Sequence, residues 1–384
     1  FPLVLLSALA ALWAIRHRTR APLAAALFFC GTLFPALGFV NVFPFRYSFV
    51  ADHFQYLPSL SLIALLSAGL AGAVGRWMSR IRPALATAGM LVLVGPLACL
   101  TWNQSRQYVD AETLYRTTLD RNPTCWLAME NLGAMKLQGP ISSVPEAMRL
   151  IQQALKINPN SAEAVNNLGY ALQRLDRVEE AVTCHQEAVR LSPGFAKARY
   201  NLGVDLQRLG RFEEAESQYK ESVKLDPEYP YVRNNLGNVL QRMGRTDEAV
   251  AQYQTALRLK LDYPEAHNDL GAALAQLGRF EEAATEHQEA LRLKPGFADA
   301  HYNLGNALQQ SGRLEEAVAQ FREALELKPD HLEAHNNLGA ALVSLGRLEE
   351  AAGQFRDAVE IDPRSVESHN NLGVALERLG RHAE

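Results

Sequence analysis

Cysteine is scarce in this sequence, and the few cysteines form no recognisable pattern. Only four occur among 384 residues, and no two of them stand in a CxxC pair. Disulfide frameworks and structural zinc sites need paired or regularly spaced cysteines. We therefore expect neither kind of site, and the sequence predicts no metal and no cofactor.

Motifs that carry catalysis are missing as well. Residues 106–384 contain no HExxH, no glycine-rich phosphate loop and no serine, histidine and aspartate set in a motif context. The formal net charge of −4 is near neutral, which argues against a nucleic-acid-binding surface. The sequence therefore names no catalytic residue and predicts no nucleic-acid partner.

Charge is absent from long stretches near the start of the chain. Residues 21–45, 53–75 and 83–105 hold no Asp, Glu, Lys or Arg, and a helix of about 20 residues crosses the hydrocarbon core of a bilayer. The sequence thus predicts a membrane domain over residues 1–105, with about four transmembrane helices near residues 1–15, 22–40, 57–75 and 83–100. Because the chain begins inside an apolar run, we expect this domain to be truncated at its N-terminus.

The loops between these runs differ in charge. Residues 16–20 and residues 76–82 carry three arginines each, whereas residues 41–56 carry only Arg46 and Asp52. Arginine-rich loops tend to be cytoplasmic, so we expect the 41–56 loop and everything after residue 101 to be extracytoplasmic, in the periplasm or the ER lumen. If one run is a re-entrant segment, the orientation inverts.

The rest of the chain repeats itself. The tripeptide Asn-Leu-Gly or Asp-Leu-Gly recurs with its glycine at residues 133, 169, 203, 237, 271, 305, 339 and 373, and every step after the first is 34 residues. A 34-residue period is typical of paired helices that stack into a solenoid. We predict an all-α fold in which transmembrane helices are followed by a right-handed α-solenoid over residues 106–384. Its parts would be a half repeat at 106–125 and repeats from about residues 126, 162, 196, 230, 264, 298, 332 and 366, the last one truncated.

Within each period the residue types resemble those of tetratricopeptide (TPR) repeats. With the motif glycine counted as position 8, the repeat from residue 298 has the family's residues at positions 7, 8, 20, 24, 27 and 32, namely Leu304, Gly305, Ala317, Phe321, Ala324 and Pro329. Glycines near position 15 are expected to end the first helix, and prolines at position 32 to end the second. Leu261 replaces that proline in one repeat, where we expect a less sharply defined stop.

An amide recurs at position 6 of the repeats. The members of this amide row are Asn131, Asn167, Asn201, Asn235, Asp269, Asn303, Asn337 and Asn371. Positions 2, 6, 9 and 13 share one face of a helix, and an amide both donates and accepts hydrogen bonds. The row is similar to the asparagine ladder of O-linked N-acetylglucosamine transferases, which implies that it binds the backbone of an extended polypeptide. In that interpretation the side chains face the groove and not the seams between helices. The alternative is a surface residue that tolerates tight packing nearby.

Histidines recur at position 4 of four successive repeats, as His267, His301, His335 and His369. Helix axes are ~8–10 Å apart, too far for these rings to share a zinc ion at ~2 Å. We expect them to fill a half-buried place that is aromatic in the family. A separate alternative is that His331 and His335, four residues apart, share an ion.

The charged and aromatic segment at residues 45–60 carries a second resemblance. The run from Ala51 to Ser59, ADHFQYLPS, resembles a motif of the transmembrane and TPR-containing protein O-mannosyltransferases and their bacterial relatives. That family implies a polytopic glycosyltransferase that uses a polyprenyl-phosphate-linked sugar. By this resemblance Arg46 and His53 would contact the lipid phosphate, although His53 stands where the family has arginine. The alternative is an interfacial anchor in which Arg46 pairs with Asp52.

Two functions therefore stay open. One is the C-terminal part of a glycosyltransferase whose repeats hold the acceptor polypeptide, with its catalytic residues outside this segment. The other is a membrane-anchored TPR scaffold without enzymatic activity that binds protein partners. Paired acidic residues in an outward loop upstream of residue 1 would favour the enzyme.

Overall fold

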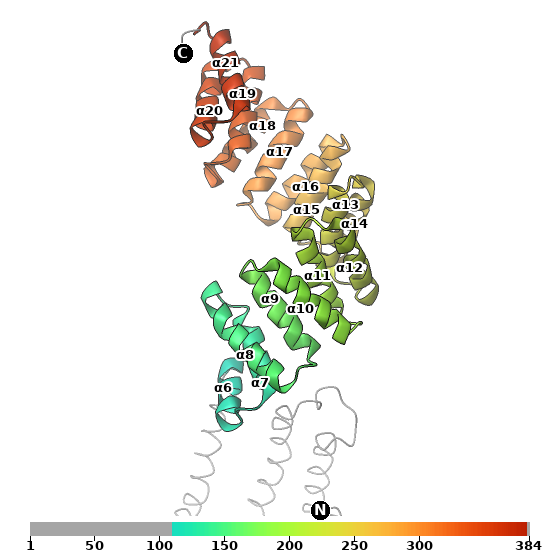
Figure 1. The fold of residues 1–384 in the computed structure, drawn as a ribbon. Coiled ribbons are helices and arrows are strands. Elements are labelled where there is room, and N and C mark those ends of the chain that lie inside the picture. Colours follow the sequence, from blue (N-terminus) through green and yellow to red (C-terminus); the bar gives the residue numbers. More distant parts are fainter. Residues whose placement is uncertain (1–109, 382–384) are drawn as a thin grey trace, which may run out of the picture. The chain divides into compact units, whose positions relative to one another are not determined.

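The computed structural model describes residues 110–381. The predicted transmembrane helices and the 41–56 loop lie outside these residues. Between residues 110 and 381, no helix is both long enough and apolar enough to cross a bilayer. This part of the chain is entirely helical, with sixteen α-helices, one short 3₁₀ helix and no strand, as a TPR solenoid requires (Figure 1).

Helices alternate regularly along the chain. After α6 (Ala111–Arg121), the first helices of the repeats are α7 (Trp126–Lys136), α9 (Ala162–Arg174), α11 (Ala196–Arg208), α13 (Pro230–Arg242), α15 (Pro264–Gln276), α17 (Ala298–Gln310), α19 (Leu332–Ser344) and α21 (Val366–Arg378). The 3₁₀ helix Ile141–Ser143 precedes the second helices, which are α8 (Val144–Ile157), α10 (Val178–Leu191), α12 (Phe212–Leu225), α14 (Thr246–Leu259), α16 (Phe280–Leu293), α18 (Leu314–Leu327) and α20 (Leu348–Ile361). The chain divides into two compact units at residues 132 and 133, and the helices from α8 onward belong to the second.

Glycine ends the first helices, as the sequence predicts. The glycines two residues after six of these helices have φ between 72° and 77°, a left-handed conformation that glycine adopts without strain. In the repeat from residue 162, Asp176 takes this place with φ 62°. The turn thus keeps its geometry even where glycine is replaced.

The expectation about Leu261 is wrong. Helix α14 ends at Leu259, the same position of the repeat at which α12 and α16 end. Pro264 is the first residue of α15, and a proline disfavours helical backbone in the residue before it. The second helix therefore cannot run on into the next one, with or without a proline at residue 261.

Close contact between the two helices of a repeat holds the second unit together. A Cβ atom on Gly203 would lie 2.5 Å from the Tyr219 ring, and one on Gly305 would lie 2.6 Å from the Phe321 ring. Alanines at positions 20 and 27, such as Ala317 and Ala324, are fully buried. Small residues thus let large rings pack closely against the facing helix.

Candidate peptide-binding surface

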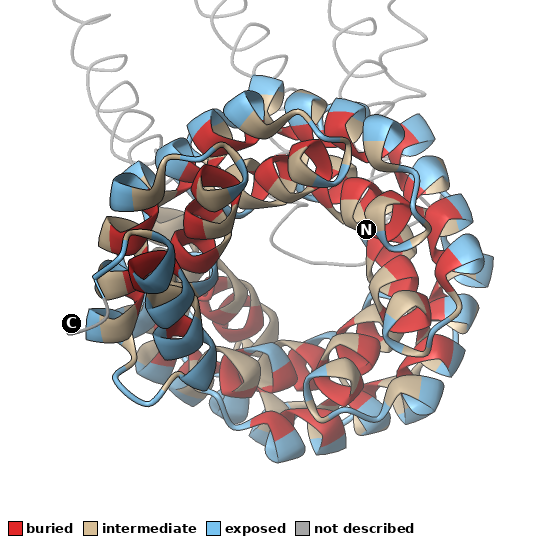
Figure 2. Cartoon of the chain, turned by 90° about the horizontal axis from the view of Figure 1, so that it is seen from above, coloured by how far each residue is buried: buried red, intermediate tan, exposed pale blue. Residues whose placement is uncertain are grey.

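The first helices lie on the inner side of the curved stack. Each first helix from α9 to α19 contacts the next first helix directly, and the second unit winds around a common axis with its exposed residues gathered on the outer ring (Figure 2). We call positions 2, 6, 9 and 13 of α9 to α21 the inner stripe. On α15, for example, Glu265 and Gln276 are exposed, whereas Asp269 and Ala272 are half-buried. On α15 the two ends of the stripe are thus accessible and the row member Asp269 lies half-buried between them, whereas Asn201 of the row is buried.

Members of the amide row bridge successive repeats. Each bonded member contacts the residue at position 5 of the repeat before it, 35 residues earlier. The asparagine Nδ2 atoms donate from Asn201 to Asn166 Oδ1 (2.9 Å), from Asn235 to Tyr200 Oη (3.2 Å), from Asn303 to Asn268 Oδ1 (3.1 Å) and from Asn337 to Tyr302 Oη (3.2 Å). The expectation that these side chains avoid the seams is therefore wrong. Asn337 Nδ2 also donates to Asn306 Oδ1 at 2.8 Å. A primary amide has two N–H groups and an acceptor oxygen, so an amide with one such bond keeps an N–H and its oxygen for a ligand, whereas Asn337 keeps its oxygen.

The remaining members lie toward the two ends of the row. Asn131 on α7, Asn167 on α9 and Asn371 on α21 are half-buried. Asn131 belongs to the first unit, whereas Asn167 and Asn371 belong to the second. Peptide binding by the row remains a prediction.

At Asp269 the direction of the bridge is reversed. Asn234 Nδ2 donates to Asp269 Oδ2 at 2.9 Å. Burial raises the pKa of the Asp269 carboxyl, hydrogen bonds from Asn234 and Asn238 oppose that shift, and the charge of Glu265 adds to it. The row thus contains one carboxylate amid amides.

Four tyrosines border the row, and the sequence reasoning missed them. The tyrosine strip is Tyr200, Tyr229, Tyr231 and Tyr263, with successive ring centroids 5.4, 5.4 and 5.2 Å apart. These are edge-to-face or tilted contacts of the kind aromatic rings favour. The 34-residue spacing of Tyr229 and Tyr263 was a signal that was available in the sequence.

Position 13 of the first helices is an arginine in four repeats, as Arg174, Arg208, Arg242 and Arg378. Arg174 Nη1 donates to the carbonyl oxygens of Leu137 and Gly139, and Arg208 pairs with Asp176. Both side chains therefore tie adjacent repeats together. Arg242 on α13 is exposed.

Two of the position-4 histidines contact both a glutamine of the second helix and the backbone of the turn that precedes their own helix. His301 contacts Gln320 Oε1 and the Pro295 carbonyl oxygen, and His335 contacts Gln354 Oε1 and the Pro329 carbonyl oxygen, at 2.8–3.1 Å. Both ring nitrogens of His335 are thereby engaged, which leaves none for an ion shared with His331. No group of three or more potential ligands gathers in residues 110–381.

A polar cluster centred on the fully buried side chains of His185 and Asp205 lies between the repeats from residues 162 and 196. His185 Nδ1 and Asp205 Oδ2 are 2.6 Å apart, with both side chains inaccessible to solvent. Gln173 Nε2 donates to the other oxygen of Asp205 at 2.8 Å, and His185 Nε2 contacts the Asn166 carbonyl oxygen. Every polar group of the ring has a partner, so the cluster is structural.

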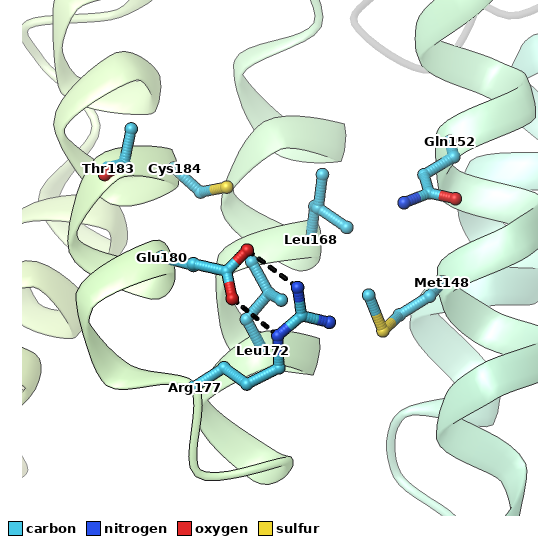
Figure 3. A pocket seen from close by; sticks show the side chains of 8 residues that line it. All are labelled: Met148, Gln152, Leu168, Leu172, Arg177, Glu180, Thr183 and Cys184. Carbon is cyan, nitrogen blue, oxygen red and sulfur yellow. Dashed lines mark hydrogen bonds and ion pairs between the residues drawn. The ribbon is translucent and has the colours of Figure 1, made fainter.

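A pocket of about 310 Å³ opens between α8, α9 and α10, and none of its lining residues belongs to the inner stripe. Met148 and Gln152 of α8 face Cys184 and Leu168 across it, and Arg177 is held by both oxygens of Glu180 (Figure 3). Burial raises the pKa of the Cys184 thiol, which disfavours the reactive thiolate. The lining groups form no arrangement for nucleophilic or acid–base chemistry.

The comparisons with known proteins agree with this fold. Residues 142–338 match the family model of the Cilia and flagella-associated protein 70 C-terminal domain, and residues 339–380 match that of the TPR repeat. Because the first match spans more than half of the chain, the chain belongs to the family of the Cilia and flagella-associated protein 70 C-terminal domain, a family of TPR domains. Repeats of this kind bind peptide or protein partners, so the chain is a TPR protein that mediates protein–protein interaction.

Several solved structures resemble the chain, and no curated protein matches it. One is the APC/C hetero-tetramer Cut9–Hcn1, with a TM-score of 0.57, 17% identity and coverage of 69% of this chain and 52% of that one. Another is pilF of Pseudomonas aeruginosa, with a TM-score of 0.50, 19% identity and coverage of 54% and 95%. YrrB, a TPR protein with an unusual peptide-binding site, has a TM-score of 0.42 and 26% identity, with coverage of 48% of this chain and 95% of YrrB. The chain spans about half the length of the first, and the likenesses to Cut9–Hcn1 and pilF show the fold alone.

Proposed function

We propose that the second unit binds an extended polypeptide along the inner stripe, with the amide row contacting the peptide backbone. The observation that carries this proposal is the row itself: Asn201, Asn235, Asn303 and Asn337 are oriented alike by one repeated hydrogen bond. Side chains fixed in this way lose little further entropy when a ligand binds. Amides can pair with any peptide backbone, which suits a partner recognised by its extended form.

The decisive experiment compares two double variants of the full chain. Asn235→Ala with Asn337→Ala removes two amides from the stripe, whereas Tyr200→Phe with Tyr302→Phe removes the tyrosine oxygens to which they donate and leaves the amides in place, with Asn337 still bonded to Asn306. A neutral hydrogen bond contributes ~0.5–1.5 kcal/mol, so the asparagine double should lose more stability than the tyrosine double by about one such bond.

Only the asparagine double should lose affinity for unstructured peptides, by roughly 5- to 150-fold for two hydrogen bonds. Fluorescence anisotropy with peptides selected from a random library would measure it, beside thermal melts of both doubles. Equal affinity of the asparagine double and the parent would refute the proposal.

We propose further that residues 1–105 anchor this domain in a membrane and that the repeats are extracytoplasmic. The uncharged stretches and the arginines of residues 16–20 and 76–82 support this placement. A reporter that is active only outside the cytoplasm, fused after Glu384, should be active. Activity of a cytoplasmic reporter at the same place would overturn the orientation.

A second candidate function is transfer of sugar from a lipid-phosphate donor to protein. Its support is the resemblance of residues 51–59 to the O-mannosyltransferase motif. Contacts among the described residues add nothing to it. Charge-assisted hydrogen bonds to phosphate are strong, so His53→Ala and Arg46→Ala should weaken binding of a polyprenyl-phosphate-linked sugar. His53→Arg should preserve or raise it. Equal binding by all three variants would leave only the anchor interpretation.

A further inference from the structure

Asp269 is a half-buried carboxylate without a cation. Two other carboxylates withdrawn from solvent have cationic or histidine partners: Asp205 faces His185 at 2.6 Å, and Glu216 binds Lys220 and Arg245, each at 2.7 Å. In the part of the chain that the structure describes, the groups that hydrogen-bond to Asp269 are neutral amides. Because withdrawing a charge from water is costly unless it is paired, this carboxylate lacks a counter-charge that a ligand can supply.

The tyrosine strip ends beside this carboxylate. Tyr263 directly precedes α15. Asn234, which donates to Asp269 at 2.9 Å, follows Tyr231 by three residues on α13 (Pro230–Arg242), so these two side chains share a helix face. The residue Tyr231 is 36% exposed. An accessible aromatic ring thus lies in the strip that ends at Asp269.

The strip already holds a cation of the chain itself. Lys260 Nζ lies 4.7 Å from the centroid of the Tyr231 ring and 4.9 Å from that of Tyr263, and it donates to Tyr231 Oη at 2.8 Å. Cations within about 6 Å of a ring face are attracted by its quadrupole. These rings therefore present faces that accept an ammonium or guanidinium group.

We propose that Asp269 and Tyr231 form a subsite for a lysine or arginine side chain of the bound peptide. The inference rests on the proposed peptide-binding function. The backbone of the peptide lies along the amide row, its cation pairs with the Asp269 carboxylate, and the side chain packs against the Tyr231 ring. Asp269 would then set the register, because it is the one row member that attracts a positive charge.

The variant Asp269→Asn tests this directly, because it restores the amide that the other members of the row carry. Phage-displayed random dodecapeptides are selected against the full chain in detergent micelles, in parallel for the parent and for Asp269→Asn. Peptides selected by the parent should share a lysine or arginine at one place, and peptides selected by Asp269→Asn should not. Glu281→Gln, an exposed change on α16 of the same repeat, serves as the matched control.

Selected arginine peptides are then compared with their citrulline versions, which keep the shape and lose the charge. The parent and Glu281→Gln should lose about 10-fold or more in affinity with citrulline, and Asp269→Asn should lose less than about 3-fold. Tyr231→Leu should weaken the preference for arginine, whereas Tyr231→Phe should keep it. These comparisons use one protein preparation per variant and differ only in the charge of the peptide.

The outcomes separate the two proposals. If peptides bind the parent through Asn235 and Asn337 but citrulline costs the parent and Asp269→Asn equally, the cation subsite is refuted and the peptide surface stands. If the parent enriches no peptide, or binds peptides independently of these asparagines, the peptide surface fails and the subsite fails with it.

Discussion

The glycine of each Asn-Leu-Gly motif is packed or open depending on what stands against its helix. Gly305 faces the Phe321 ring, whereas a Cβ on Gly373 would have no neighbour within 4 Å. The same tripeptide therefore serves two different environments in one chain.

The substitutions Gly305→Ala and Gly373→Ala should have opposite effects. Overpacking a core costs about 1–3 kcal/mol, so Gly305→Ala should lower the free energy of unfolding by an amount in that range. Gly373→Ala should raise it by up to about 1 kcal/mol, because alanine favours helix over glycine. Chemical denaturation of both variants would decide, and similar destabilisation by both would contradict the packing argument.

His287 fills position 24, where the repeats from residues 196, 230, 298 and 332 have tyrosine or phenylalanine and the repeat from residue 162 has His185. Its ring is fully buried, and Nε2 has no hydrogen-bond partner among the residues described. Burial lowers the pKa of His287 from 6.5 to about 4. Because the unfolded chain takes up the proton first as the pH falls, His287 costs stability progressively between pH 6.5 and about 4.

Replacing His287 by phenylalanine should therefore reduce acid sensitivity. At pH 4 the gain relative to neutral pH should approach about 3 kcal/mol, measured by denaturation across pH. Phe321→His places a histidine at the equivalent position of the next repeat and should introduce a similar loss in acid. A pH profile unchanged by both substitutions would contradict this account.

At the scale of the helix, α14 ends without the proline that follows the neighbouring second helices. Lys260 has φ −143° and ψ 98°, close to the −139° and 82° of Lys294, which does precede a proline. The backbone before residue 261 is therefore already compatible with proline. Leu261 itself is 75% exposed and contributes little packing.

Leu261→Pro should accordingly stabilise the chain by about 0.4–1 kcal/mol, because it restricts the unfolded state. Thermal and chemical denaturation would measure the gain. Leu261→Ala is the control, since it removes the same exposed side chain without fixing φ. A proline variant less stable than the alanine variant would show that the turn needs a conformation that proline cannot adopt.

The order of the helices and most of their ends were predictable because they depend on local chemistry, whereas the end of α14 at Leu259 was not. Gly278 ends α15 and Pro264 begins it whatever lies elsewhere in the chain. The hydrogen-bond partners of the amide row were not predictable, because they depend on side-chain rotamers and on contacts between repeats. Asn235, for example, donates to Tyr200, which lies 35 residues earlier in the chain. Asp269 was visible as a gap in the row, but its lack of a cation became apparent only from its surroundings.

At the scale of the whole second unit, stability is shared between neighbours. In a stack of repeats each unit depends mainly on the units beside it. Helix α21 packs on α20 and α19, and Val366 is 83% exposed. The interior helix α17 is covered by neighbours on both sides along the stack.

Backbone amides of α21 should therefore exchange with solvent at least about tenfold faster than those of α17. Native-state hydrogen exchange read by mass spectrometry would test this. Equal protection of the two helices would indicate a cooperative unit that extends over all the repeats. Gly305→Ala should shift the protection of α17 and its neighbours more than that of α9, if coupling decays along the stack.

The hydrogen bonds between residues 35 apart in the chain also affect how the stack of repeats responds to force. Each bond between Asn337 and Tyr302, or between Asn235 and Tyr200, joins the first helices of two adjacent repeats, which stretching of the stack along its axis would separate. The stack of repeats then behaves as a spring whose stiffness depends on these hydrogen bonds. A peptide bound along the same amides would link the same repeats a second time, so the stack with bound peptide should resist stretching more than the stack without it.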